Sequence, residues 1–187
     1  MMLESYPWKM EVQRHQRLLQ RWSTLPSTER GDFYIERAVF LSAFILRKMM
    51  ENKKVTDALR GRSIRCRSYV PFRALSDRVS RFLGVFDPAN DYDMADSKEI
   101  TLSCFDLMSE IMHSYVFHFV SGEQDRLEGF LVNSYNKRDD RLLFVELSEF
   151  DNILTAAIAD NVMAMTITIH PNSGTVTAEV SGKKSRV

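Results

Sequence analysis

The chain is poor in the residues that cross-link or punctuate small proteins: its 187 residues include 2 cysteines, 7 glycines and 5 prolines. Cys66 and Cys104 lie far apart, form no CxxC motif and have no histidine at ligand spacing, which excludes a zinc finger. No internal repeat or low-complexity segment is present, so a solenoid is not expected. A chain of this length buries enough surface to fold without disulfides or a structural metal.

An excess of charge of one sign is also missing, because 25 basic and 25 acidic residues cancel. No global field therefore attracts nucleic acid or an anionic membrane. The longest apolar run, residues 38–46, is interrupted by Ser42 and is far shorter than the roughly 20 residues that span a bilayer. Residues 1–22 lack the apolar core of a signal peptide. We therefore expect a cytoplasmic protein that makes no membrane contact.

The common catalytic and cofactor motifs are absent as well. The chain contains no P-loop, no GxGxxG, no GxSxG and no HExxH, so no cofactor is expected. The acidic segment Asp91–Asp96 does not fit a calcium loop, because Ala95 replaces a ligand and Leu102 stands where a bidentate glutamate is required. These absences favour a binding protein over an enzyme.

The composition that remains, 44% apolar and 27% charged residues, is typical of one globular domain, here residues 1–182. A helix is predicted from Trp8 to Trp22 and a longer one from Thr28 to Asn52. Apolar residues cover most of the circumference of the longer helix, so we expect it at the centre of the fold with Phe40 and Phe44 buried.

The pattern changes from helical to strand-like after residue 113, which predicts an α+β fold. Its helical part is residues 1–113 and its antiparallel sheet part is residues 114–182, in ββ-α-ββ order. The predicted elements between the long helix and the sheet part are a strand at 63–70, a helix at 71–83, a loop at 87–97 and a helix at 96–113. The predicted elements of the sheet part are strands at 115–120, 130–135 and 141–147, a helix from 148, and a hairpin at 162–169 and 175–180. Residues 183–187 are predicted to be a disordered tail.

One helix face carries residues suited to acid–base or metal chemistry. Asp106, Glu110 and His113 follow at i, i+4 and i+7 and so share a face of the predicted 96–113 helix. Glu110 and His113 form a Glu-x-x-His pair, but a carboxylate-bridged metal site needs two such pairs, so no metal is expected. The Arg-x(4–6)-His motif of HEPN-type ribonucleases is absent. These three residues are the predicted catalytic set if the chain is an enzyme, and a solvated polar face otherwise.

Arginines form the densest charge cluster. Residues 60–81 contain seven arginines and one acidic residue, whereas residues 87–99 contain five acidic residues and one lysine. Arginine binds phosphate and carboxylate bidentately, which predicts an anion-binding surface. The predicted anion-binding residues are Arg62, Arg65, Arg67 and Arg73. Tyr69 on the same strand face offers a ring for base stacking. In the alternative, segment Asp91–Asp96 pairs with these arginines, within the chain or in a second subunit.

Together these patterns predict a binding or regulatory module that acts through a protein partner or forms homo-oligomers. The C-terminal hairpin supports this interpretation, because exposed strand edges need cover. Its apolar residues on one face are Met163, Met165, Ile167 and Ile169. The alternative is a nuclease in which His113 is the acid/base and the arginine block holds the phosphates of a nucleic acid.

Overall fold

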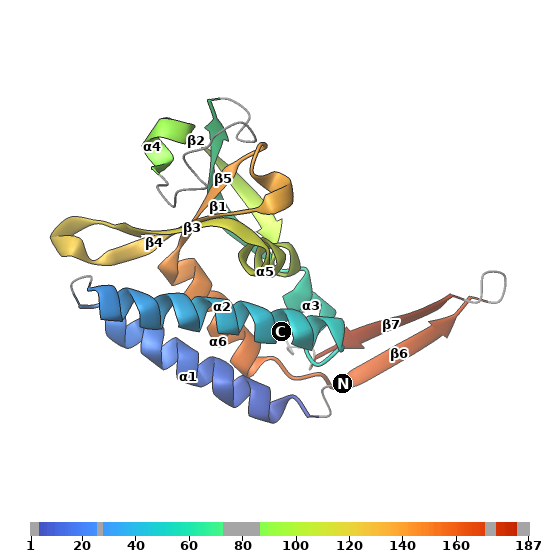
Figure 1. Cartoon of the computed structure of the whole chain (residues 1–187). Coiled ribbons are helices and arrows are strands. Elements are labelled where there is room, and N and C mark those ends of the chain that lie inside the picture. Colours follow the sequence, from blue (N-terminus) through green and yellow to red (C-terminus); the bar gives the residue numbers. More distant parts are fainter. Residues whose placement is uncertain (1–3, 26–27, 73–86, 171–174, 183–187) are drawn as a thin grey trace.

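The protein has an α+β fold, with the long helices in its first half and an antiparallel sheet (Figure 1). The computed structural model describes residues 4–25, 28–72, 87–170 and 175–182. The helices are α1 (Tyr6–Trp22), α2 (Glu29–Glu51), α3 (Asp57–Arg60), α4 (Pro88–Asp91), α5 (Cys104–Met112) and α6 (Leu147–Ala159). The strands are β1 (Ser63–Pro71), β2 (Tyr92–Ser103), β3 (Ser114–Ser121), β4 (Leu127–Ser134), β5 (Leu142–Glu146), β6 (Ala164–Ile169) and β7 (Val176–Ser181). Short 3₁₀ turns occupy Glu123–Asp125 and Tyr135–Lys137.

The main sheet has five antiparallel strands in the order β2-β1-β5-β4-β3. Helices α5 and α6 contact one face of the sheet, and α1 and α2 pack against these helices (Figure 1). Side chains alternate along a strand, so Leu143 and Val145 of β5 join the core beneath the helices. Leu142 and Phe144 point the other way and belong to a second buried cluster. Strand β5, which the sequence analysis placed at residues 141–147, thus has two buried apolar faces and lies inside the sheet between β1 and β4.

Helix α2 begins where the sequence predicts it. The Thr28 hydroxyl accepts a hydrogen bond from the Gly31 N–H (3.1 Å), which caps the first turn. A Cβ on Gly31 would lie 3.1 Å from the Trp22 ring, so glycine lets α1 and α2 approach closely. The buried side of α2 includes Val39 and Leu46, each 0% exposed, which confirms the helix as part of the core.

The prediction that α2 is buried around most of its circumference is wrong for its outer side. Phe44 is 43% exposed and Phe33 is 58% exposed, while Phe40 is only half-buried. The reason is geometric: α1, α5 and the sheet cover one side of the helix and leave an open stripe along the other. This exposed side of α2 carries aromatic as well as charged residues.

Strand β2 is the main departure from the predicted elements. Residues 87–97 were expected to be a loop and residues 96–113 a helix, but α5 begins at Cys104 and Tyr92–Ser103 is a strand. The cap of α5 is Ser103, whose hydroxyl accepts from the Asp106 N–H (3.1 Å). Strand β2 lies at the edge of the sheet and its middle, residues 95–99, is exposed, so apolar alternation is confined to Ile100 and Leu102 near its end.

The strands of the second half and the helix between them are confirmed, with three strands before α6. Two strands of the main sheet, β1 and β2, come from the predicted helical part, residues 1–113. Strands β6 and β7 do not join the main sheet but form a separate two-stranded hairpin, here called the arm (Figure 1). Most of the predicted helix at 71–83 and the tail at 183–187 lie outside the described residues. Within the described ranges, no helix is both long and apolar enough to cross a bilayer.

Candidate functional site

The predicted catalytic residues meet at a cavity of about 540 Å³ beside α5. Asp106 and Glu110 contribute from α5, and His113 follows its last residue. The opposite wall is built from the end of β4, the turn at residues 135–137 and Arg141. The volume lies in the range of small-molecule sites, so the hydrogen bonds of the lining residues decide whether the cavity can be a catalytic centre.

Glu110 acts as a structural group in this cavity. Its side chain is buried, and its carboxylate accepts hydrogen bonds from the Ser134 N–H (2.9 Å) and from Arg141 Nη2 (3.2 Å). These bonds fix the end of β4 and the start of β5 to helix α5. Both oxygens of this carboxylate are engaged, one by a guanidinium and the other by a backbone N–H, which argues against the predicted catalytic role of Glu110.

Asp106 and His113 are at opposite ends of α5. The carboxylate of Asp106 accepts from the Ser103 hydroxyl (2.6 Å) as part of the helix cap. His113 is exposed, and its backbone N–H donates to the Ser109 carbonyl (3.0 Å). Seven residues of α-helix rise about 10 Å, so Asp106 is two turns from His113. In the described part of the chain, no hydrogen bond to the His113 imidazole is found that would orient it for catalysis.

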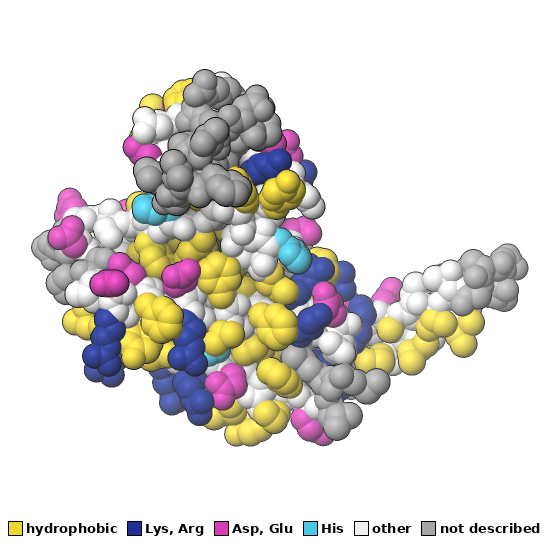
Figure 2. All heavy atoms as spheres, viewed as in Figure 1, with side chains coloured by type: hydrophobic (Ala, Val, Ile, Leu, Met, Phe, Trp, Pro, Cys, Tyr) yellow, Lys and Arg dark blue, Asp and Glu magenta, His cyan; other side chains and the backbone are white. Residues whose placement is uncertain are grey.

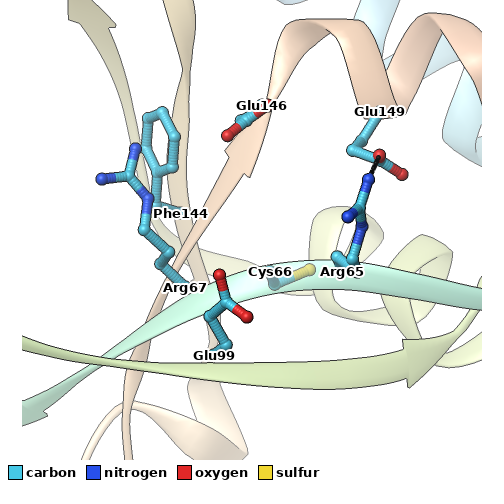
Figure 3. Close-up of a pocket in the computed structure, with 7 residues that line it drawn as sticks. All are labelled: Arg65, Cys66, Arg67, Glu99, Phe144, Glu146 and Glu149. Atoms are coloured by element: carbon cyan, nitrogen blue, oxygen red, sulfur yellow. Dashed lines mark hydrogen bonds and ion pairs between the residues drawn. The ribbon is translucent and has the colours of Figure 1, made fainter.

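The arginine block lies on the other face of the sheet, at a second cavity of about 320 Å³ (Figure 3). Arg65 forms an ion pair with Glu149 of α6 (3.0 Å), marked in Figure 3. Arg67 places its guanidinium carbon 4.3 Å from the centre of the Phe144 ring. Glu99 and Glu146 complete the lining, so carboxylates outnumber guanidiniums and a polyanion is not favoured.

The prediction that segment Asp91–Asp96 pairs with the arginines is therefore wrong for Arg65, which pairs with Glu149. The β1–β2 register places Arg65 opposite Thr101 and Arg67 opposite Glu99, away from segment Asp91–Asp96. Glu149 replaces that segment because the first turn of α6 reaches over β1. Glu149 lies 84 residues from Arg65 in the chain, so the sequence near Arg65 gives no sign that the two residues pair.

The remaining residues of the predicted anion surface do not extend it. Tyr69 is only 6% exposed and belongs to the second buried cluster, so it offers no stacking surface. The register of β1 is continuous from Ser63 to Tyr69, so the ring shares the face of Arg65 and Arg67 as expected, but it is buried there beside Leu142. Arg62 precedes β1, and its carbonyl accepts from the Cys104 N–H (2.8 Å). Arg73 lies outside the described residues.

The two cysteines are not nucleophiles in this structure. Burial raises the pKa of Cys66, which lines the second cavity, to about 11, an effect that the charge of Arg141 partly offsets. Burial raises the pKa of Cys104 to about 12, against the charge of Arg62. Only the thiolate attacks electrophiles or binds metals, so both thiols are inert near neutral pH. Among the residues that the structure describes, no group of three His, Cys, Asp or Glu side chains could hold a metal ion.

A cluster that sequence analysis missed surrounds Phe105 on α5. The guanidinium carbons of Arg47 and Arg60 lie 3.5 and 4.0 Å from the centre of its ring. Arg47 also donates to the Ser109 hydroxyl and forms an ion pair with Glu51 (2.9 Å). These contacts tie α2, α3 and α5 together. The three residues come from separate elements, so their sequence spacing gives no sign of the cluster.

The most exposed apolar surface is on the arm. The register pairs Ile169 with Val176, Ile167 with Ala178 and Met165 with Val180, so apolar side chains fill one face. Thr166 and Thr168, opposite Glu179 and Thr177, make the other face polar. Figure 2 shows this division, with hydrophobic side chains along one side of the projecting arm. The five exposed members are Met163, Met165, Ile167, Ile169 and Val176, at 51–68% exposure.

The base of the arm is held firmly to the body. Val180 is 4% exposed, and its N–H donates to Asp57 Oδ2 of α3 (2.8 Å). Burial opposes the ionisation of Asp57, but the bonds from Val180 and Lys53 outweigh it and lower the pKa of this carboxyl. Asp160, before the arm, accepts from the hydroxyl and the N–H of Thr56, both at 2.7 Å. The arm is thus fixed in direction at its base while its apolar face stays in solvent.

Comparisons with protein-family models, with curated proteins and with solved structures find no match to this chain.

Proposed function

We propose that this protein is a binding module that acts through protein–protein contact, with the arm as its binding element, and that it forms homo-oligomers. The observation that carries the proposal is the exposed apolar face of the arm, on a hairpin anchored at its base. An exposed apolar surface of this kind marks an interaction site in a folded protein.

The energy available from covering the arm is large enough for association. Full burial of one large apolar side chain contributes about 1.5–3 kcal/mol. The five exposed arm residues retain between half and two-thirds of their surface in solvent. Covering them therefore contributes about 5–9 kcal/mol per arm, before the costs of ordering and association are subtracted. A two-stranded hairpin is also marginal on its own, so a partner that covers it stabilises the arm.

The nuclease alternative receives less support. His113 and the arginine pair line separate cavities on opposite faces of the sheet, so one substrate phosphate does not reach both. Glu110 is engaged by Arg141, and three glutamates offset Arg65 and Arg67. A net charge of zero adds no attraction for nucleic acid.

Sedimentation velocity over a concentration series tests the proposal. The arm variant Met165→Glu/Ile167→Glu places two charges on the apolar face, and the matched control Thr166→Glu/Thr168→Glu places the same charges on the polar face of the same strand. We expect the wild type and the control to associate and the arm variant to stay monomeric. A wild type that remains monomeric at all concentrations, or an arm variant that associates as the wild type does, contradicts the proposal.

A further inference from the structure

A second exposed apolar surface lies along the outer side of α2. Phe33, Leu41 and Phe44 are 58%, 37% and 43% exposed, and together they are called the stripe. Phe33 and Phe44 are eleven residues, or three turns, apart and so face the same direction. The other side of α2 lies in the core, and Leu41 lies about 60–80° around the helix from Phe33 and Phe44. Together the three exposed apolar residues form a surface that a partner can cover.

The stripe continues onto the edge of the main sheet. Between its two ends Phe40 packs against Phe117 of β3 at a tilted angle, with ring centres 4.8 Å apart, and the Phe119 ring lies 5.2 Å from that of Phe117. Strand β3 is an edge strand, with β4 as its one neighbour in the sheet. Figure 2 shows hydrophobic side chains gathered on the face of the molecule over α2 and β3. The stripe and these rings form one apolar shelf.

We propose that the arm of one copy of this chain docks with its apolar face on the stripe of a second copy, and that the two copies exchange arms reciprocally. This inference rests on the proposed function and identifies both the partner and the docking surface. The arm extends away from its own body and is fixed at its base by the bond from Val180 to Asp57, so it does not fold back onto its own α2 (Figure 1).

The two surfaces match in length. Eleven helical residue steps separate Phe33 from Phe44 and rise about 16 Å. Six extended residue steps, from Met163 just before β6 to Ile169 at its end, span about 20 Å. Each chain carries one arm and one stripe, so a dimer with a two-fold axis covers both pairs and leaves neither in solvent.

The covered area reaches what a stable dimer needs. At about 25 cal/mol per Å², a side chain whose burial contributes about 1.5–3 kcal/mol has about 60–120 Å² of apolar surface. The five arm and three stripe residues are 37–68% exposed, so two copies cover roughly 800 Å² of apolar side chain. Since about 60% of an interface is apolar, the whole contact is about 1,300 Å², within the roughly 1,200–2,000 Å² of stable complexes.

Complementation between variants tests the exchange. The stripe variant is Leu41→Glu/Phe44→Glu, and the control is Tyr135→Glu, which alters an aromatic residue that is 59% exposed on another surface. We expect the stripe variant to lose at least about 100-fold in dimer association constant, and the control to keep it. Circular dichroism and melting curves verify that each variant is folded.

The decisive step mixes the stripe variant with the arm variant Met165→Glu/Ile167→Glu. Each variant alone lacks both arm–stripe contacts, whereas the mixed dimer regains one, so its association constant should exceed those of both homodimers. A mixture that associates no better than its components overturns the exchange. A stripe variant that dimerises like the wild type also overturns it and leaves the proposed function standing, with arm-to-arm contact in its place. An arm variant that dimerises like the wild type contradicts both.

Discussion

Replacing Glu110 should destabilise the fold, because its buried carboxylate holds the end of β4 and the start of β5 to helix α5. Its side chain is 9% exposed, and Glu110→Ala removes the acceptor for the Ser134 N–H and the partner of Arg141. Breaking a buried ion pair from one side costs about 3–5 kcal/mol. The Arg141 side chain is 26% exposed and regains some hydration, so the lower end, about 3 kcal/mol, applies.

The effect is measured by thermal and denaturant unfolding. For a chain of this size 1 kcal/mol shifts the melting temperature by about 2–4 °C, so Glu110→Ala should lower it by about 6–12 °C. Glu110→Gln keeps an acceptor for the Ser134 N–H and should cost less, about 1–2 kcal/mol. The control Glu51→Ala removes a glutamate that also pairs with an arginine but is exposed, and should cost at most about 1 kcal/mol. Unchanged or raised stability in Glu110→Ala refutes the structural role and restores Glu110 as a candidate functional group.

Three further predictions concern buried or anchoring groups. Burial lowers the pKa of His15, with Arg37 and Arg14 adding to it against Glu11, so the unfolded chain binds more protons below about pH 6.5. The melting temperature should therefore fall between about pH 7.5 and 5.5, and His15→Gln should flatten that slope. Asp57→Ala should speed hydrogen exchange of the Val180 amide while the amides of β4 keep their protection; equal rates in variant and wild type argue against the anchor. Cys66 and Cys104 should react with a thiol reagent near pH 8 only at the rate of unfolding, and fast labelling of the native protein would show that they are accessible.

The sequence predicted the elements whose apolar periodicity reflects burial. Strand β5 has apolar residues on both faces and lies inside the sheet, and the alternation of Met165, Ile167 and Ile169 marks one face of the arm. In both cases the pattern is set by which side chains leave water, a property that a single chain records directly. The pattern does not tell whether another element covers an apolar face. Phe44 was expected to be buried because it is apolar, but it is 43% exposed.

The parts that could not be predicted depend on pairing across long separations. Strand β2 has a polar sequence that resembles a capping box, and it becomes a strand because it pairs with β1 along most of its length. The partner of Arg65 was expected nearby in the chain, yet Glu149 reaches it from α6. Glu110 and His113, grouped by their spacing on a helix, line one cavity. The bonds that occupy Glu110 come from Ser134 at the end of β4 and from Arg141 before β5, which that spacing does not show.

Cysteine cross-linking tests most directly whether the arm of one copy docks on the stripe of a second copy. Both native thiols are buried, so a new cysteine on the surface is the reactive one. Chains carrying Ile167→Cys are mixed with chains carrying Phe44→Cys under mild oxidation, and Thr168→Cys, on the polar face of the arm, replaces Ile167→Cys as the control. Arm exchange predicts an inter-chain disulfide between positions 167 and 44 that forms much faster than any product of the control. No such disulfide, or one that forms no faster than with Thr168→Cys, contradicts the exchange of arms.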